Sequence, residues 1–333
     1  MKKALIITTI LLVFAAIGLL ARGYTASSPA VQETISGDWT AKVKQPDRGP
    51  ALWLSLSRNS GAGKGRFQMS SDFPLQDFTG LDPNANSNTR FTLQREAGEV
   101  LFDGLFKDGR GVGDFRFTPN SGFASTMRNL GYGDLSVEKL FSMTMHDVGL
   151  KFIDELKSLG YDKIPVDKLI AMRIHGADGD FIRRMRAAGY DEIPEDKLIA
   201  MRIHGVDEKF IREAEALGYK GLPVDSLITM RIHGIDQEYV SGVQSLGYNN
   251  IPFDKLVAMR IHGVSGKFIK EMEDSGYNDI SVDKLIAMRI HGVDSKFVRE
   301  MKDQGFNDLS IDDLINLRIH GVDSDYVRRM KGK

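Results

Sequence analysis

Residues 189–217 read GYDEIPEDKLIAMRIHGVDEKFIREAEAL, and this stretch decides the fold because the chain repeats its pattern in constant register. All seven histidines of the protein recur at intervals of 29 residues, from His146 to His320. Glycines that precede an aromatic residue keep the same interval. A strict period of this length is typical of stacked supersecondary units, each of which needs its neighbours to bury its apolar face. The sequence therefore predicts seven 29-residue units over residues 131–333.

Each unit is predicted to be a pair of helices joined by glycine turns. Pro194 suits a helix start, and Gly205 suits the left-handed residue that ends that helix. Asp207 suits the N-cap of the second helix, which Gly218 ends. The first helix has an apolar surface wide enough to be packed between neighbouring units, formed by Leu198, Ile199, Met201 and Ile203.

The same positions in the other units define the structural residues of the repeat. The glycines predicted to end the first helices are Gly176, Gly205, Gly234, Gly263 and Gly292. Those predicted to end the second helices include Gly189, Gly218, Gly247 and Gly276. Asp207 and Asp236 are predicted N-caps of second helices.

Residues 120–130 resemble the second half of a unit. Asn120 occupies the N-cap position of the repeat, and Phe123 occupies its phenylalanine position. We therefore expect a half-repeat that caps the helical units at their N-terminal end.

Residues 37–119 have the alternation of β-strands. Apolar and polar residues alternate around Leu54 and again around Phe115, and turn sequences separate these stretches. About six to eight antiparallel strands fit into this length, which suggests a small sandwich or a partly closed barrel. The predicted fold class is thus α+β: a small antiparallel β sandwich or barrel, followed by an α/α solenoid of seven two-helix repeats with an N-terminal half-repeat.

The N-terminal segment is typical of export. Lys2 and Lys3 precede 17 uncharged residues, and small residues follow. This pattern predicts a signal peptide over residues 1–26, or an uncleaved anchor in the inner membrane. Residues 27–36 then form a flexible tether. We expect the rest of the chain to be periplasmic or extracellular, with membrane contact only through an uncleaved N-terminal segment.

The composition excludes several kinds of protein. Lys and Arg number 44 against 45 Asp and Glu, so there is no basic excess for general nucleic-acid binding. The chain contains no cysteine, which rules out disulfides, thiolate zinc sites and a cysteine nucleophile. We expect no nucleic-acid partner.

The histidine of each unit is predicted to cap its helix rather than to bind metal. Neighbouring helices pack about 8–10 Å apart, whereas zinc needs ligand nitrogens at about 2.0–2.1 Å from one centre. One histidine per unit therefore makes a row and not a cage. We predict neither a metal site nor a cofactor.

Two charged positions recur in the first helices. An arginine occupies one of them in six units, and an aspartate lies six residues before it. These two residues do not face each other within one helix, so the sequence suggests an Arg–Asp ladder between adjacent units, or arginines that contact a ligand. The candidate partner-binding residues are Arg173, Arg202, Arg231, Arg260, Arg289, His204, His233 and His262.

These repeats resemble those of a known group of bacterial proteins. The sequence MRIHGV at 201–206, followed by FIRE at 210–213 and LGY, resembles the helical repeats of bacterial secreted proteins. It is also similar to the exported C-terminal extensions of membrane antirepressor metalloproteases of the beta-lactam-sensor type. The likeness spans roughly residues 98–333, and the protease part of those proteins has no counterpart in this sequence. It implies an envelope sensing or interaction role, and no catalytic residue.

The sequence thus favours a non-enzymatic exported module, monomeric, that offers a long surface to a protein or peptide. One alternative is a cell-wall or glycan binder, in which sugars would stack on Trp39, Trp53, Tyr190, Tyr219, Tyr248 and Tyr277. The other is a hydrolase with its site in the β domain, built from Asp38, Asp72, Asp77 and Asp103.

Overall fold

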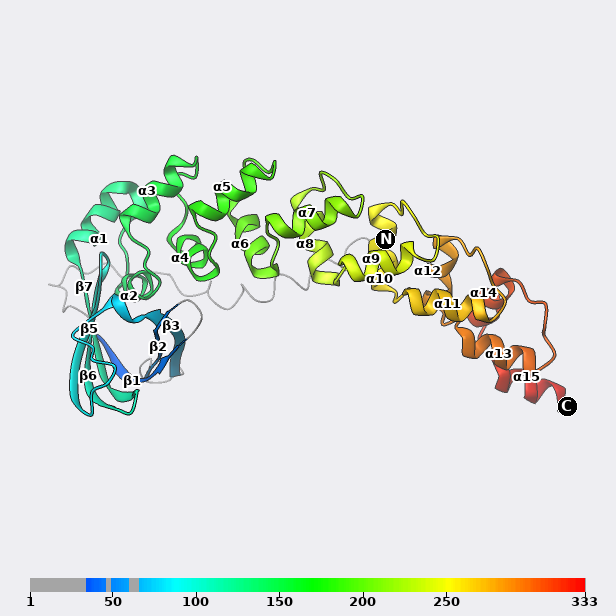
Figure 1. The fold of residues 1–333 in the computed structure, drawn as a ribbon, viewed down its shortest axis with the longest axis horizontal. Helices are drawn as coiled ribbons and strands as arrows, with labels where there is room; N and C mark the ends of the chain where they lie inside the picture. Colours follow the sequence, from blue (N-terminus) through cyan, green and yellow to red (C-terminus); the bar gives the residue numbers. More distant parts are fainter. Residues whose placement is uncertain (1–33, 46–48, 60–65, 333) are drawn as a thin grey trace, which may run out of the picture.

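The protein is an α+β chain in which a β domain precedes a run of helices, as the sequence predicts (Figure 1). The computed structural model describes residues 34–45, 49–59 and 66–332. The predicted signal peptide or anchor and most of the predicted tether lie outside these ranges. No helix within them is long and apolar enough to cross a membrane.

The β domain is one antiparallel sheet of seven strands in the order β3-β2-β1-β7-β6-β5-β4, curled into a half-barrel (Figure 1). The strands are β1 (Ile35–Lys44), β2 (Ala51–Asn59), β3 (Arg66–Pro74), β4 (Phe78–Thr79), β5 (Ser87–Arg95), β6 (Gly98–Lys107) and β7 (Arg110–Pro119). The sequence is compatible with either a sandwich or a partly closed barrel. All described strands belong to this single sheet, which corrects the sandwich alternative.

Alternate residues of the strands form an aromatic core on one face of the sheet. Trp39 is fully buried there, with its ring centroid 5.2 Å from that of Phe91. A side chain at Gly111 would collide with the Trp39 ring, because its Cβ would lie 2.6 Å away, so the glycine makes room for the indole. Helix α2 (Val137–Met145) packs on the same face, where the Phe141 ring stacks 5.9 Å from Phe115.

The helical part begins with α1 (Ser121–Met127), which continues into a π-helical turn (Arg128–Tyr132). Each predicted unit then contains one helix pair. The first helices of the units are α2, α4 (Val166–His175), α6 (Glu195–His204), α8 (Val224–His233), α10 (Phe253–Ile261), α12 (Val282–His291) and α14 (Ile311–Ile319). The second helices are α3 (Leu150–Ser158), α5 (Gly179–Ala187), α7 (Glu208–Ala216), α9 (Gln237–Gln244), α11 (Gly266–Asp274), α13 (Ser295–Asp303) and α15 (Ser324–Lys331).

The helices form an elongated, twisted array. In Figure 1 the first helices lie below the second helices at α4 and α6, and above them at α12 and α14. Neighbouring first helices contact each other along the whole array. The row of first helices therefore winds around the long axis of the molecule.

Helix ends in the array follow the local chemistry of the sequence. The Asp207 carboxylate accepts a hydrogen bond from the Phe210 N–H at 2.9 Å, as an N-cap does. At the end of the first helix, the Val206 N–H donates to the Met201 carbonyl at 2.8 Å. Gly205 is left-handed there, with a φ of 69°. These bonds satisfy backbone groups that helix ends leave free.

Tyrosines link five of the units, from the second to the sixth, to the unit that follows. Their hydroxyls donate to a carbonyl 32 residues further along the chain, at 2.7 to 3.0 Å. The pairs are Tyr161 with Ile193, Tyr190 with Leu222, Tyr219 with Ile251, Tyr248 with Ile280, and Tyr277 with Leu309. The tyrosine thus ends its own helix and also fixes the position of the following unit.

At the junction with the β domain, a strand residue takes the place of a helix cap. The N-cap of α3 is Gly149, which has no side chain to accept a bond. Instead the Glu96 carboxylate, from the turn between β5 and β6, accepts the Leu150 N–H at 3.0 Å. A Cβ at Gly149 would lie 2.6 Å from the Glu96 Oε1 atom, so the glycine is needed for this approach.

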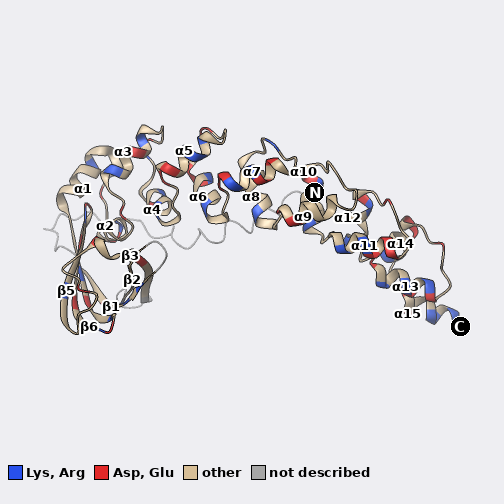
Figure 2. Ribbon diagram, in the orientation of Figure 1, with Lys and Arg blue, Asp and Glu red and all other residues tan. Residues whose placement is uncertain are grey.

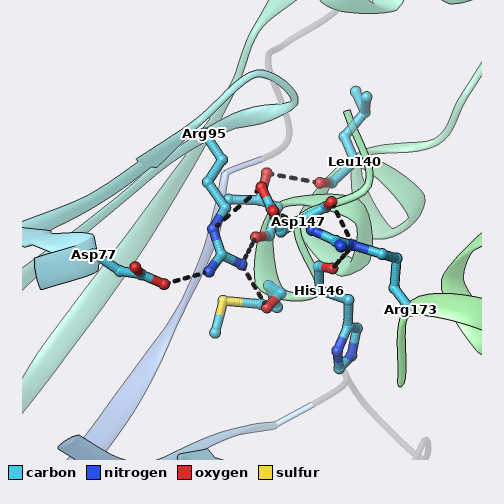
Figure 3. Close-up of polar contacts among 8 residues, drawn as sticks. Asp77, Arg95, Leu140, His146, Asp147 and Arg173 are labelled. Atoms are coloured by element: carbon cyan, nitrogen blue, oxygen red, sulfur yellow. Dashed lines mark hydrogen bonds and ion pairs between the residues drawn. The ribbon is translucent and has the colours of Figure 1, made fainter. Parts of the chain in front are cut away.

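Two arginines of the sheet complete the junction. The Arg95 guanidinium donates to the carbonyls of Thr144 and Met145 at 2.8 and 2.9 Å, and to Asp77 at 2.8 Å (Figure 3). Arg58 pairs with Glu138 at the start of α2. Both ends of the first helix of the array are therefore held by the β domain.

We predict that Tyr248→Phe lowers the free energy of unfolding by about 0.5–1.5 kcal/mol, because it removes one hydrogen bond between units. Urea unfolding measures the change. The matched control is Phe306→Tyr, which adds a hydroxyl at the same repeat position where no following unit is described. It should leave the stability unchanged, and an equal effect of both substitutions would contradict the inter-unit role.

We predict that Glu96→Ala destabilises the protein by about 1 kcal/mol, the usual cost of a lost helix cap. Gly149→Asp alone should also destabilise it, since the new carboxylate meets that of Glu96. The double variant should recover stability, because the introduced aspartate would then cap α3 as Asp178 caps α5. Strictly additive losses in urea unfolding would refute this account of the junction.

Candidate interaction surface

One apolar side chain per unit is left exposed on the first helices. It is an isoleucine in six consecutive units, and 44 to 52% of each residue is exposed. These residues are Ile174, Ile203, Ile232, Ile261, Ile290 and Ile319, which we call the isoleucine row. At the corresponding position of the first unit, Met145 is buried at the junction with the sheet.

The isoleucine row corrects one expectation from the sequence. The apolar pattern predicts Ile203 in the packed surface of its helix, together with Leu198 and Met201. Those two are fully buried, but Ile203 follows Met201 by two residues and therefore points about 200° away from it. The half-buried Ala200 lies on the same exposed side, so the row borders small side chains.

The repeated arginines join adjacent units. Each guanidinium lies 3.9 to 5.1 Å from the centre of an aromatic ring in the preceding unit. Its Nε donates at 2.9 to 3.2 Å to a carbonyl at the end of the preceding first helix. The arginine and ring pairs are Arg173 with Phe152, Arg202 with Phe181, Arg231 with Phe210, Arg260 with Tyr239, Arg289 with Phe268, and Arg318 with Phe297.

The repeated aspartates pair with lysines, which corrects the suggested Arg–Asp ladder. Each lysine reaches forward to the aspartate 28 residues later. The pairs are Lys139 with Asp167, Lys168 with Asp196, Lys197 with Asp225, Lys255 with Asp283, and Lys284 with Asp312. Ser226 replaces the lysine once, so Asp254 has no such partner among the described residues. The repeated arginines do not pair with these aspartates, because their side chains extend toward the preceding unit.

The repeated histidines lie at the edge of the isoleucine row. His204 and His262 are exposed, and His233 is half-buried. Their backbone carbonyls lie at the end of the first helix, where the His233 carbonyl accepts the Arg260 Nε at 2.9 Å. Within the described ranges, no group of three or more His, Asp or Glu residues is arranged to hold a metal ion.

All nine glycines assigned to the repeat have φ between 61° and 97°, in the region that favours glycine. They are Gly176, Gly205, Gly234, Gly263 and Gly292 after the first helices, and Gly189, Gly218, Gly247 and Gly276 after the second. Asp236 accepts the Tyr239 N–H at 2.9 Å, in the same way as Asp207 accepts that of Phe210. These residues shape the units, and the candidate surface is carried by the helices between them.

The aromatic residues proposed for sugar stacking have other contacts. Trp39 is fully buried, and its Nε1 donates to the Asp103 carbonyl at 3.2 Å. Trp53 is half-buried, with the Lys44 ammonium 5.9 Å from its ring centre. The hydroxyls of the four tyrosines named for stacking all bind backbone carbonyls of the next unit.

The four aspartates considered for a hydrolase are spread over the β domain. Asp72 pairs with Lys44 and Asp77 with Arg95. Asp38 and Asp103 line one open hollow of about 490 Å³ on the outer face of the sheet. The structure thus brings two of the four together.

No family model, curated protein or solved structure matches this chain.

One histidine differs from the others in its surroundings. His146 ends α2 at the junction with the sheet (Figure 3). Burial, and to a smaller extent the charge of Arg95, lower the pKa of His146 below its ordinary value of 6.5. The folded protein therefore favours the neutral imidazole at this position.

We predict that acid weakens this junction. Because the unfolded chain binds the proton more readily, the contribution of His146 is fully present above about pH 6.5 and is lost as the pH falls through its folded pKa. We measure the free energy of unfolding in urea at neutral and at mildly acidic pH. Between these two conditions, His146→Gln should lose less of this free energy than the parent. His291→Gln, at an exposed position of an inner unit, is the control and should behave as the parent does. If His146→Gln also keeps the full loss, the prediction is wrong.

Proposed function

We propose that this protein is an exported, non-enzymatic interaction module that holds a protein or peptide along its first helices. In this proposal the helix pairs act as an αα solenoid of seven 29-residue repeats, with the half-repeat at 120–130 and the β domain at one end. The module works in the periplasm or outside the cell, or on the inner membrane if the N-terminal segment stays uncleaved.

The isoleucine row is the observation that carries this proposal. A single exposed isoleucine is ordinary on a protein surface. Six at the same position of consecutive units form a regular row of exposed apolar side chains, and extended exposed apolar features mark interaction sites. Neither the packing of a unit nor its helix caps requires these side chains, since they point away from the buried residues.

The distribution of charge supports a protein partner over an anionic polymer. Lys and Arg are interspersed with Asp and Glu along the helices of the array (Figure 2). A nucleic-acid binder would need a continuous basic surface. The resemblance of the repeats to those of secreted and sensor-type proteins is in keeping with an interaction role.

We predict that the double variant Ile232→Asp/Ile261→Asp loses the partner while it stays folded. Substitutions at exposed positions change stability by about 0.5 kcal/mol or less, so thermal unfolding should hardly change. Immobilised parent and variant are incubated with envelope extract, and the retained proteins are quantified by mass spectrometry. At least one protein held by the parent should be absent from the variant.

The matched control is Leu105→Asp/Val112→Asp, which places two carboxylates on exposed residues of the β domain. This control should retain the same proteins as the parent. If the parent, the isoleucine variant and the control retain the same envelope proteins, the proposed function is contradicted. It is also contradicted if a protein is lost only with the control.

A further inference from the structure

The repeated arginines leave a row of positive charge without counter-ions. Arg173 has an ion pair, with Asp147. Among the described residues, the later arginines have no carboxylate partner and bind only rings and carbonyls. These are Arg202, Arg231, Arg260, Arg289 and Arg318. The lysines nearby do not add to this charge, since each is paired with an aspartate.

This charge lies directly beside the isoleucine row. Arg202 donates to the carbonyl of His175, the residue after Ile174, and it precedes Ile203 in its own helix. Each arginine therefore reaches from the position before one isoleucine to the end of the helix that carries the preceding isoleucine. The surface alternates apolar and positive groups, and its complement is a chain that alternates apolar and negative groups.

The spacing of the row fits one chain conformation. Neighbouring packed helices are about 8–10 Å apart, so successive isoleucines recur at about that distance. A polyproline II chain has three residues per turn and rises about 9 Å in that length, with every third side chain on the same side. A β-strand places residues three apart on opposite faces. The row therefore matches a polyproline II chain with one apolar residue in three.

The shape of the array favours a flexible occupant over a rigid one. The row of first helices winds around the long axis, from below the second helices at α4 to above them at α12 (Figure 1). A second copy of this rigid array would meet the row over only a part of its length. An extended chain can follow all six isoleucines.

We propose that the partner is an extended acidic segment in polyproline II conformation, with an apolar residue at every third position and carboxylates between. The apolar residues contact the isoleucine row, and the carboxylates lie beside the unpaired guanidinium groups. This proposal rests on the proposed function, and it names the kind of partner.

The test uses the full protein in the form isolated from cells, with synthetic peptides as probes. The first peptide has six Leu-Pro-Glu triplets, the second has six Leu-Pro-Lys triplets, and the third has the composition of the first in scrambled order. Fluorescence anisotropy measures binding at low and high salt. The first peptide should bind at least about tenfold more tightly than the other two, and its affinity should fall as salt screens the charges.

Ile232→Asp/Ile261→Asp should weaken binding of the first peptide by at least about tenfold, and the β-domain control Leu105→Asp/Val112→Asp should not. Equal affinity for the three peptides would overturn the proposal. So would self-association of the parent that the isoleucine variant abolishes, because the row would then be occupied by a second copy. If the peptides fail but an envelope protein is still lost with the isoleucine variant, the proposed function stands and this partner class is wrong.

Discussion

The structure depends on an arginine that reaches backward from each unit after the first onto the unit before it. Its guanidinium lies over an aromatic ring of the preceding unit and donates to a carbonyl at the end of that unit's first helix. One side chain thus covers the ring face and satisfies a backbone group that the helix end leaves free. Lysine and tyrosine reach in the opposite direction, onto the following unit. Because all three contacts recur in register, the 29-residue period cannot change by a single residue without breaking them.

The β domain holds the first unit at both ends of α2 and at the start of α3. Arg58 pairs with Glu138, as lysines pair with the aspartates of later units. Arg95 donates to carbonyls at the end of α2, and Glu96 caps α3 in place of its own N-cap residue. Thr144 stands at the arginine position of this unit and is fully buried. The sheet is therefore both a domain with its own aromatic core and a template on which the helical array is built.

Much of the fold can be predicted from the sequence because it depends on local chemistry. The contacts between residues far apart in the chain cannot be predicted in this way. The period, the glycine turns and the aspartate caps depend on a few adjacent residues, so the helix pairs follow from the sequence. The partner of Asp196 does not, because the spacing along one helix cannot tell whether the preceding unit offers Arg173 or Lys168. The prediction for Ile203 is wrong because its apolar character suggests burial, while its angle around the helix points outward. The contact of Glu96 with α3 joins residues more than 50 positions apart, and no local sequence pattern indicates it.

The contacts between units also bear on how such a protein changes over evolutionary time. Each unit meets its successor with one face and its predecessor with another, a head-to-tail interface that has no closing symmetry. Duplicating or deleting a whole 29-residue unit inside the array leaves every interface intact, because the new neighbours present the same two faces. The number of units is thus free to drift while the fold is kept. Since each unit after the first brings one exposed isoleucine, a gained or lost repeat lengthens or shortens the isoleucine row by one position.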